Sequence, residues 1–203
     1  GNVLRDLFAY RFTKSEVAGH NLGNLFITAL TDLLGSDTAA LEEASRILRI
    51  TGTVIPVTKE PTTLTARFED GSTVVGEHRI DERAAERSRI AELSYEAPAT
   101  LSVPAKKAIL EADLIVLGPG DLYTSTVAAL LPDEMKEALA TSPARIAYIA
   151  NLFTKRGQTE GYTAGDHVRE IIRYAGKEPD VIFLNQDGFS EGVLAFYEKE
   201  GEF

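Results

Sequence analysis

The feature that most constrains the fold is the segment 113–126, with the sequence DLIVLGPGDLYTST. Its residues 114–117 form an unbroken apolar run with β-branched residues in the middle, which is typical of a strand covered on both faces in a parallel sheet. Gly118-Pro119-Gly120 ends this strand abruptly, and Asp121 or Thr124 can cap the helix that follows. The segment therefore predicts one strand–turn–helix unit of an α/β fold.

The turn in this unit has the composition of an anion-binding site. Backbone N–H groups and the dipole of a helix N-terminus favour a negative charge. Gly118 and Gly120 let the backbone approach a ligand, and Tyr123, Thr124 and Ser125 place hydroxyl groups beside it. An ordinary tight turn explains the same residues equally well. The segment is neither GxGxxG nor GxxxxGK[ST], so it predicts neither dinucleotide-binding nor P-loop chemistry.

Two later strands are predicted to end at the same edge of the sheet. The apolar runs 146–151 and 180–185 each end in an asparagine, Asn151 and Asn185. Because ligands in open α/β sheets gather at the carboxyl ends of strands, both asparagines and Thr154 are expected near the glycine turn.

The loop after Asn151 is long and rich in hydroxyl groups and glycine, as functional loops often are. Its Lys155-Arg156 pair is either a phosphate contact or an ordinary solvated pair. Thr163 and Asp166 precede or open a helix expected from about His167, and they are either ligand contacts or its N-caps.

A second polar segment, HNLGN at residues 20–24, opens a very apolar helix that ends at Gly35. It can turn hydrogen-bond donors towards a ligand, or it can be a capped helix start with His20 bonded to a neighbour. Before it, residues 3–12 have the spacing of a packed helix. After it, Asp37 is expected to cap another amphipathic helix.

From Gly52 the apolar period changes from that of helices to that of strands. Strands are expected over 53–57, 62–69 and 72–75, with a hairpin turn at Asp70-Gly71, and then over 77–80 and 89–95. Residues 52–97 are therefore interpreted as an antiparallel β insertion.

Composition removes several classes of function. The net charge of −10 argues against a nucleic-acid backbone as partner. Without cysteine there is no disulfide, zinc-thiolate or thiol chemistry. The histidines lack metal-ligand spacing, so no metal site is predicted. No membrane span or signal peptide is visible, and a cytoplasmic protein is expected.

Three segments together resemble one known family. They are GHNLGNLFITALTDL at 19–33, ADLIVLGPGDLYTS at 112–125 and NLFTKRGQTEGYTAGDHV at 151–168. Their order and approximate spacing are similar to those of the gluconeogenesis-factor family (YvcK-like), which is related to the archaeal 2-phospho-L-lactate transferases (CofD-like). The resemblance covers nearly the whole chain, least distinctively over 52–97. Asn21 and Asp121 depart from it, since serine is usual at both positions.

The resemblance implies a Rossmann-like three-layer α/β sandwich with a mainly parallel sheet. Residues 1–203 are expected to form a single domain that carries the β insertion at about 52–97. Members of the family begin with a glycine-rich GGGTG strand–turn–helix, followed by DDGGSSG-like and PPGD segments. These segments belong before Gly1, so the chain is expected to be incomplete at its N-terminus and to lack part of the ligand site.

The resemblance also implies a nucleotide-sugar site. Carried over position by position, its expected residues are His20, Gly23, Asn24, Gly118, Pro119, Gly120, Tyr123, Thr124, Ser125, Asn151, Thr154 and Asp166. No catalytic residue and no metal ligand are predicted among them.

The implied function is that of a UDP-sugar-binding regulatory protein, a gluconeogenesis factor needed for cell shape and cell-wall homeostasis on gluconeogenic carbon. Such a protein is expected to be non-catalytic, and its further partners are cell-wall regulatory proteins or a second copy of the chain. The first alternative is a transferase that moves a phospholactyl-type group from a nucleotide-diphosphate donor, with Mg²⁺ as its metal. The second is an NAD-binding protein, which only the Rossmann-like fold suggests.

Overall fold

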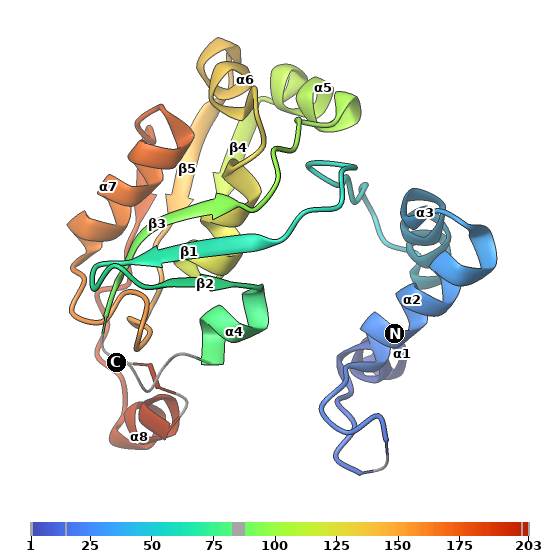
Figure 1. Ribbon diagram of the computed structural model, residues 1–203, viewed down its shortest axis with the longest axis horizontal. Helices are drawn as coiled ribbons and strands as arrows, with labels where there is room; N and C mark the ends of the chain where they lie inside the picture. Colours follow the sequence, from blue (N-terminus) through green and yellow to red (C-terminus); the bar gives the residue numbers. More distant parts are fainter. Residues whose placement is uncertain (1, 15, 83–87, 200, 203) are drawn as a thin grey trace. The chain divides into compact units, whose positions relative to one another are not determined.

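The computed structural model describes residues 2–14, 16–82, 88–199 and 201–202. The chain divides into two compact units, residues 1–56 and 57–203 (Figure 1). The regular elements described for the first unit are all helices, and both sheets lie in the second unit. Each unit is described by itself below.

The first unit consists of α1 (Asn2–Ala9), α2 (Leu22–Leu34) and α3 (Asp37–Leu48). As predicted, α2 ends at Gly35, which adopts a left-handed conformation with φ of 68°. Ser36, not Asp37, is the N-cap of α3, because its side chain accepts a hydrogen bond from the backbone N–H of Ala39.

Helix α1 is shorter and less buried than its apolar spacing predicts. It ends at Ala9, and Val3, Leu4 and Leu7 are all exposed within the described chain. Its contact with α2 is made by Phe8, whose ring lies edge-on to Phe26 with the centroids 5.1 Å apart. The expectation of a packed helix over 3–12 is therefore wrong in its extent and in most of its buried face.

The second unit begins with the predicted antiparallel sheet, formed by β1 (Leu64–Phe68), β2 (Thr73–Val75) and β3 (Ile90–Tyr95). The strand order is β2-β1-β3. Alternation of buried and more exposed residues along β1 matches the period of two found in the sequence. The hairpin at residues 70–71 and the antiparallel interpretation are confirmed.

Two of the five strands expected in this region are wrong. Residues 53–57 form no regular strand, since Pro56 has no N–H and the Val57 carbonyl accepts its hydrogen bond from Ser102 instead, at 2.7 Å. Residues 77–80 open helix α4 (Glu77–Glu82), and the buried Ile80 donates its N–H to the Gly76 carbonyl at 3.0 Å. A segment with one apolar residue carries no period that separates helix from strand.

The parallel sheet has the order β4-β5-β6 and is built from β4 (Leu114–Leu117), β5 (Arg145–Ile149) and β6 (Val181–Phe183). All pairs are parallel, so the three carboxyl ends meet at one edge. Strand β4 was expected to be covered on both faces, and this expectation is wrong. Leu114 is 57% exposed and Val116 is 48% exposed in the described chain. An apolar run shows that a strand suits burial, not that both faces are buried.

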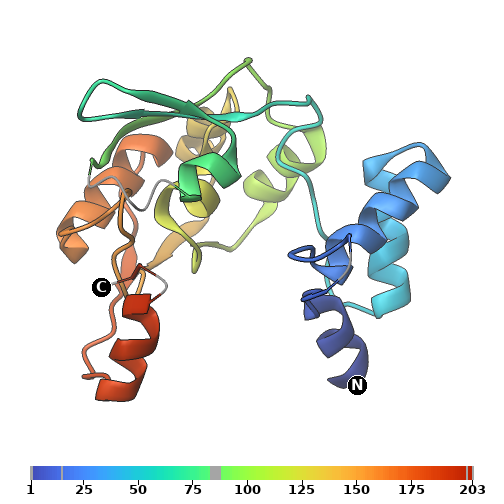
Figure 2. The ribbon, with the colours of Figure 1, turned by 60° about the horizontal axis from the view of Figure 1, so that its bottom comes forward.

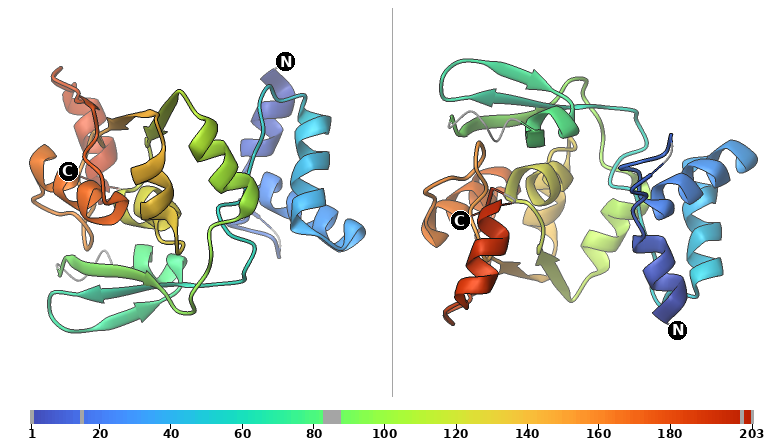
Figure 3. Two further views of the ribbon diagram at one scale, coloured as in Figure 1. Left: turned by 90° about the horizontal axis from the view of Figure 1, so that it is seen from above. Right: turned by 90° about the horizontal axis from the view of Figure 1, so that it is seen from below.

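The helices of the second unit are α5 (Val103–Glu111), η2 (Leu122–Val127), η3 (Ala128–Leu130), α6 (Met135–Thr141), α7 (Ala164–Ala175) and α8 (Glu191–Lys199). Figures 2 and 3 show η2, η3 and α7 between the antiparallel sheet and the parallel sheet. The helix predicted after the glycine turn is present, but it is wound as one π-helical turn followed by a 3₁₀ turn. The predicted Rossmann-like α/β class is confirmed.

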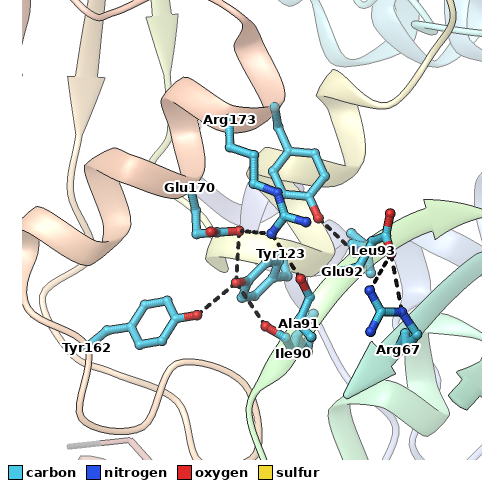
Figure 4. Close-up of polar contacts among 10 residues, drawn as sticks. Arg67, Ile90, Ala91, Glu92, Leu93, Tyr123, Tyr162, Glu170 and Arg173 are labelled. Carbon is cyan, nitrogen blue, oxygen red and sulfur yellow. Dashed lines mark hydrogen bonds and ion pairs between the residues drawn. The ribbon is translucent and has the colours of Figure 1, made fainter. Parts of the chain in front are cut away.

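A buried polar network ties the middle layer to β3 (Figure 4). The Tyr123 hydroxyl lies 2.9 Å from that of Tyr162, 3.2 Å from the Ile90 carbonyl and 3.1 Å from the Glu170 carboxylate. Burial first, and then its contact with Tyr162, raises the pKa of Tyr123 above its usual value. The hydroxyl therefore stays protonated and acts as a structural hydrogen-bond donor.

Helix α7 makes the same kind of contact near its end. The Tyr174 hydroxyl accepts the backbone N–H of Leu93 at 2.7 Å, and Arg173 donates to the Ala91 carbonyl at 2.9 Å. The Leu93 donor and the Ala91 acceptor both lie on β3, so α7 fixes the antiparallel sheet against the rest of the unit.

Candidate functional site

The carboxyl edge of the parallel sheet brings the glycine turn and Asn151 together. The Asn151 Nδ2 donates to the carbonyl of Gly120 at 2.7 Å and so links the end of β5 to the turn after β4. This neighbourhood was expected from the strand order of an open α/β sheet. This hydrogen bond fixes the backbone of the turn at the edge of the sheet.

Glycine is required at position 118 for packing. Gly118 has a φ of 87°, and a Cβ there would lie 2.8 Å from the backbone oxygen of Ile149. At Gly120 a Cβ would lie 3.0 Å from the Cβ of Ser125, which is a tight contact. The first glycine therefore lets β4 and β5 approach, and the second lets the turn lie against η2.

A pocket of about 320 Å³, here called the rim pocket, opens beside this turn. Its lining includes Pro119, Gly120, Asn151, Phe153, Lys155 and Tyr197. The rings of Phe153 and Tyr197 are stacked, with centroids 4.4 Å apart and planes 22° apart. The pocket thus combines exposed backbone, one ammonium group and an aromatic pair with the acidic side chains of Asp121 and Glu202. The aromatic pair suits a ligand with a planar ring.

Lys155 joins three segments of the chain at the floor of the rim pocket. Its Nζ donates to Asp81 at 2.9 Å and to Asp121 at 2.5 Å. Gln158 also donates to Asp81, at 2.7 Å. Burial alone lowers the pKa of Lys155, but the hydrogen bonds to Asp121 and Asp81 outweigh it and leave that pKa raised. The ammonium is therefore held in its charged form.

This cluster differs from what the sequence predicts for the turn. Asp121 occupies the N-cap position of η2 without a side-chain hydrogen bond to its backbone, and its carboxylate binds Lys155 instead. The Thr124 hydroxyl faces the carboxylates of Asp81 and Asp121 at 3.4 Å each, so it does not cap the helix either. Asp81 lies 40 residues before Asp121 in the chain, and no local motif in the sequence joins the two.

Three residues expected around the ligand are not part of the rim pocket's lining. Tyr123 is 0% exposed and Thr124 is 6% exposed, so both belong to the core, whereas Ser125 lies on the surface. The π-helical turn directs Tyr123 into the network with Tyr162. The geometry therefore supports a structural role for the Tyr123 hydroxyl, and a direct ligand contact stays a prediction.

Asp166 takes part in capping the N-terminus of α7. Its carboxylate accepts the backbone N–H of Thr163 at 2.7 Å and the Thr163 hydroxyl at 2.6 Å, and the Thr163 hydroxyl accepts the backbone N–H of Asp166 at 3.2 Å. This reciprocal pair is a capping box, with Arg169 as a further partner of the carboxylate. Of the two explanations open from the sequence, the N-cap is the one that the geometry supports.

The capping box predicts a pH dependence. Hydrogen bonds from the Thr163 hydroxyl and then from its backbone N–H lower the pKa of Asp166 from 3.8 to about 2. Because the folded pKa is depressed, the stabilisation is present above about pH 4 and is lost as the pH falls towards 2. Urea unfolding should therefore show a smaller loss of stability between pH 5 and pH 2.5 in Asp166→Asn than in the native chain. Asp32→Asn, at an exposed position of α2, is the control, and equal losses in all three proteins contradict the prediction.

The HNLGN segment lies in the first unit. Asn21 caps α2 by accepting the N–H of Asn24 at 3.3 Å, and a Cβ on Gly23 would lie 2.9 Å from the Phe8 ring and backbone. His20 and Asn24 are exposed. The helix-capping explanation of this segment is confirmed for Asn21, while a shared ligand cleft for His20, Gly23, Asn24 and the glycine turn stays a prediction.

Thr154 lines a second pocket, of about 460 Å³, beyond the ends of β5 and β6. Asn151 and Asn185 line it as well, so the two asparagines that end these strands meet there as expected. His167, which the sequence placed only as a helix start, is also in its wall. The described residues contain no group of three or more His, Asp or Glu side chains that could hold a metal ion.

A family model, 2-phospho-L-lactate transferase CofD, matches residues 1–203. The chain belongs to the CofD family. A relative from Thermotoga maritima whose name is gluconeogenesis factor is 40% identical over 200 residues, which are 98% of this chain and 63% of the relative. The Gluconeogenesis factor of Bacillus subtilis is 36% identical over 203 residues, or 98% of this chain and 62% of that protein.

The CofD-family fold is also found in a crystal structure of a UPF0052-family protein from Bacillus halodurans. It superimposes with a TM-score of 0.87 at 35% identity and covers 98% of this chain and 64% of the other. The chain thus spans a little under two thirds of the length of these relatives. No helix in the described part of this CofD-family chain is long and apolar enough to cross a membrane.

Proposed function

We propose that this chain carries the ligand site of a gluconeogenesis-factor-type regulatory protein, which binds a UDP-sugar without turning it over. In this role it acts in the cytoplasm on cell shape and cell-wall homeostasis during growth on gluconeogenic carbon. Relatives named gluconeogenesis factor support this branch of the family over the transferase branch. The ligand class is inferred from the chemistry of the rim pocket.

The observation that carries the proposal is the pairing of Lys155 with stacked aromatic rings beside an exposed turn. A nucleoside diphosphate offers a planar base for stacking and phosphates for an ammonium group and backbone N–H groups. Phe153 and Tyr197 provide the stacking surface, and Lys155 provides the charge. Because two aspartates already pair with Lys155, its charge is more than balanced, so we expect only modest affinity for phosphate, with the backbone N–H groups of the turn supplying further hydrogen bonds.

A phospholactyl-type transferase is the second candidate, and the description of the matching family model favours it. The two functions are separated by calorimetric titration with UDP-N-acetylglucosamine, UDP-glucose, GDP and NAD, each with and without Mg²⁺. Selective binding of the UDP-sugars, with the ligand recovered unchanged, supports the sensor. Preference for GDP with Mg²⁺ supports the transferase, and preference for NAD rejects both.

Tyr197→Ala should weaken UDP-sugar binding by about tenfold, because an aromatic contact contributes about 0.5–1.5 kcal/mol beyond its buried area. Phe196→Ala is the matched control, since the neighbouring ring is 60% exposed and is not part of the pocket's lining. Calorimetry gives both affinities, and thermal unfolding verifies the fold of each variant. Equal affinities for the two variants would place the base elsewhere.

A further inference from the structure

The second pocket, here called the His167 pocket, has walls unlike those of the rim pocket. It holds about 460 Å³ and is lined by the amide side chains of Asn151 and Asn185, the rings of Phe153 and Phe189, and His167. The two phenylalanine rings lie 4.7 Å apart and form one apolar wall. Amides opposite aromatic faces are the groups that suit a ligand with hydroxyl groups and C–H faces.

His167 is held rigidly and has one nitrogen without a partner. The residue is 4% exposed, and its Nδ1 lies 3.1 Å from the carbonyl of Thr163. The ring of Tyr162 packs edge-on against the imidazole, with centroids 5.6 Å apart. Its Nε2 is buried and has no hydrogen-bond partner among the residues that the structure describes.

The hydrogen bond at Nδ1 determines what Nε2 can do. A carbonyl oxygen only accepts, so Nδ1 carries the proton and the neutral ring presents a lone pair at Nε2. A buried acceptor without a donor lowers stability, and such atoms are uncommon in native proteins. In a residue that lines a pocket, this acceptor is suited to an O–H or N–H group of a ligand.

The two pockets adjoin each other. Asn151, Leu152 and Phe153 line both, so one extended ligand can lie across this short segment. The rim pocket offers charge and stacking, whereas the His167 pocket offers amides, an apolar wall and a neutral acceptor. The groups of the rim pocket match the nucleotide half of a nucleotide sugar, and those of the His167 pocket match its sugar half.

We infer that the His167 pocket binds the hydroxyl-bearing sugar ring of the ligand whose nucleotide occupies the rim pocket. The His167 Nε2 accepts a hydrogen bond from a sugar hydroxyl, and the Phe153–Phe189 wall packs against the C–H face of the ring. The inference rests on the proposed function, and it makes His167 the residue that distinguishes a nucleotide sugar from the free nucleotide.

Imidazole NMR tests this contact directly, because the chain contains only three histidines. His20→Gln and His78→Gln, both at exposed positions, assign the ¹⁵N signals of the native chain. UDP-N-acetylglucosamine should shift the His167 Nε2 signal, and UDP should not, although both should shift the backbone amide of Gly120. Shifts at Gly120 without one at His167 overturn the inference and leave the proposed function standing. No shift at either position with either ligand rejects both.

Two variants of His167 separate the acceptor from the fold. Asparagine can keep a donor near the Nδ1 position but has nothing at Nε2, whereas glutamine can place an amide oxygen near Nε2. His167→Asn should lose about tenfold in affinity for UDP-N-acetylglucosamine, whereas His167→Gln should stay within about threefold. The affinity for UDP should be equal in all three proteins. Native affinity of His167→Asn for the sugar nucleotide, with the fold verified by thermal unfolding, overturns the inference.

Discussion

Tyr123→Ala is expected to lower the free energy of unfolding by about 3–5 kcal/mol, the largest effect of any substitution at the candidate site. The ring is fully buried between the two sheets, and removing it leaves a cavity in the middle layer. It also removes the hydroxyl that contacts Tyr162, Ile90 and Glu170. Tyr123→Phe keeps the ring and should cost about 1–2 kcal/mol, because only the hydrogen bonds are lost.

Urea unfolding followed by circular dichroism measures both changes. Tyr10→Ala is the control, since that ring is 50% exposed and should lose much less stability. The two substitutions at position 123 also separate structure from ligand contact. A stable Tyr123→Ala variant that binds no UDP-sugar would restore the role that the sequence predicts for this residue.

Lys155→Met is expected to cost about 2–3 kcal/mol, between the values for surface and fully buried ion pairs. The side chain of Lys155 is 22% exposed, and those of Asp81 and Asp121 are 32% and 34% exposed. Without the ammonium, two partly buried carboxylates lie close together with no cation between them. The rim pocket also loses the charge proposed to bind phosphate, so UDP affinity should fall in parallel.

Lys107→Met provides the matched control, because that side chain is 70% exposed and its ion pair with Glu111, at 3.9 Å, lies on the surface. The double variant Lys155→Met with Asp81→Asn should recover part of the lost stability, since it removes one of the two uncompensated charges. Additive losses in this cycle would show that Lys155 and Asp81 are not energetically coupled, which contradicts the explanation by charge.

The sequence predicts those parts of the fold that carry a clear period or an unambiguous stop. Strands β1 and β3 follow the alternation of their apolar residues, and α2 ends at Gly35 as its glycine indicates. The prediction from sequence fails at residues 77–80, where one apolar residue is too few to show a period. It also fails at 53–57, whose hydrogen-bond partner is a backbone group far away in the chain. Local patterns cannot report a hydrogen bond made far away in the chain.

The candidate site divides in the same way. Asn151 and the glycine turn were predictable together, because parallel strands bring their carboxyl ends to one edge. The burial of Tyr123 was not predictable, since a tyrosine beside a glycine turn gives the same local sequence whether its ring faces a ligand or the core. Asp81 and His167 were missed as site residues. Asp81 lies on a helix that was expected to be a strand, and the unpartnered Nε2 is a property of packing alone.

The contacts that build the rim pocket have a consequence for the order of folding. Lys155 and Asp81 are 74 residues apart in sequence, and Leu93 and Tyr174 are 81 apart. Closing loops of this length costs entropy before the contacts return any stabilisation. The pocket therefore forms only once the antiparallel sheet has docked onto α7 and η2, late in folding. A nascent or partly unfolded chain therefore lacks the rim pocket.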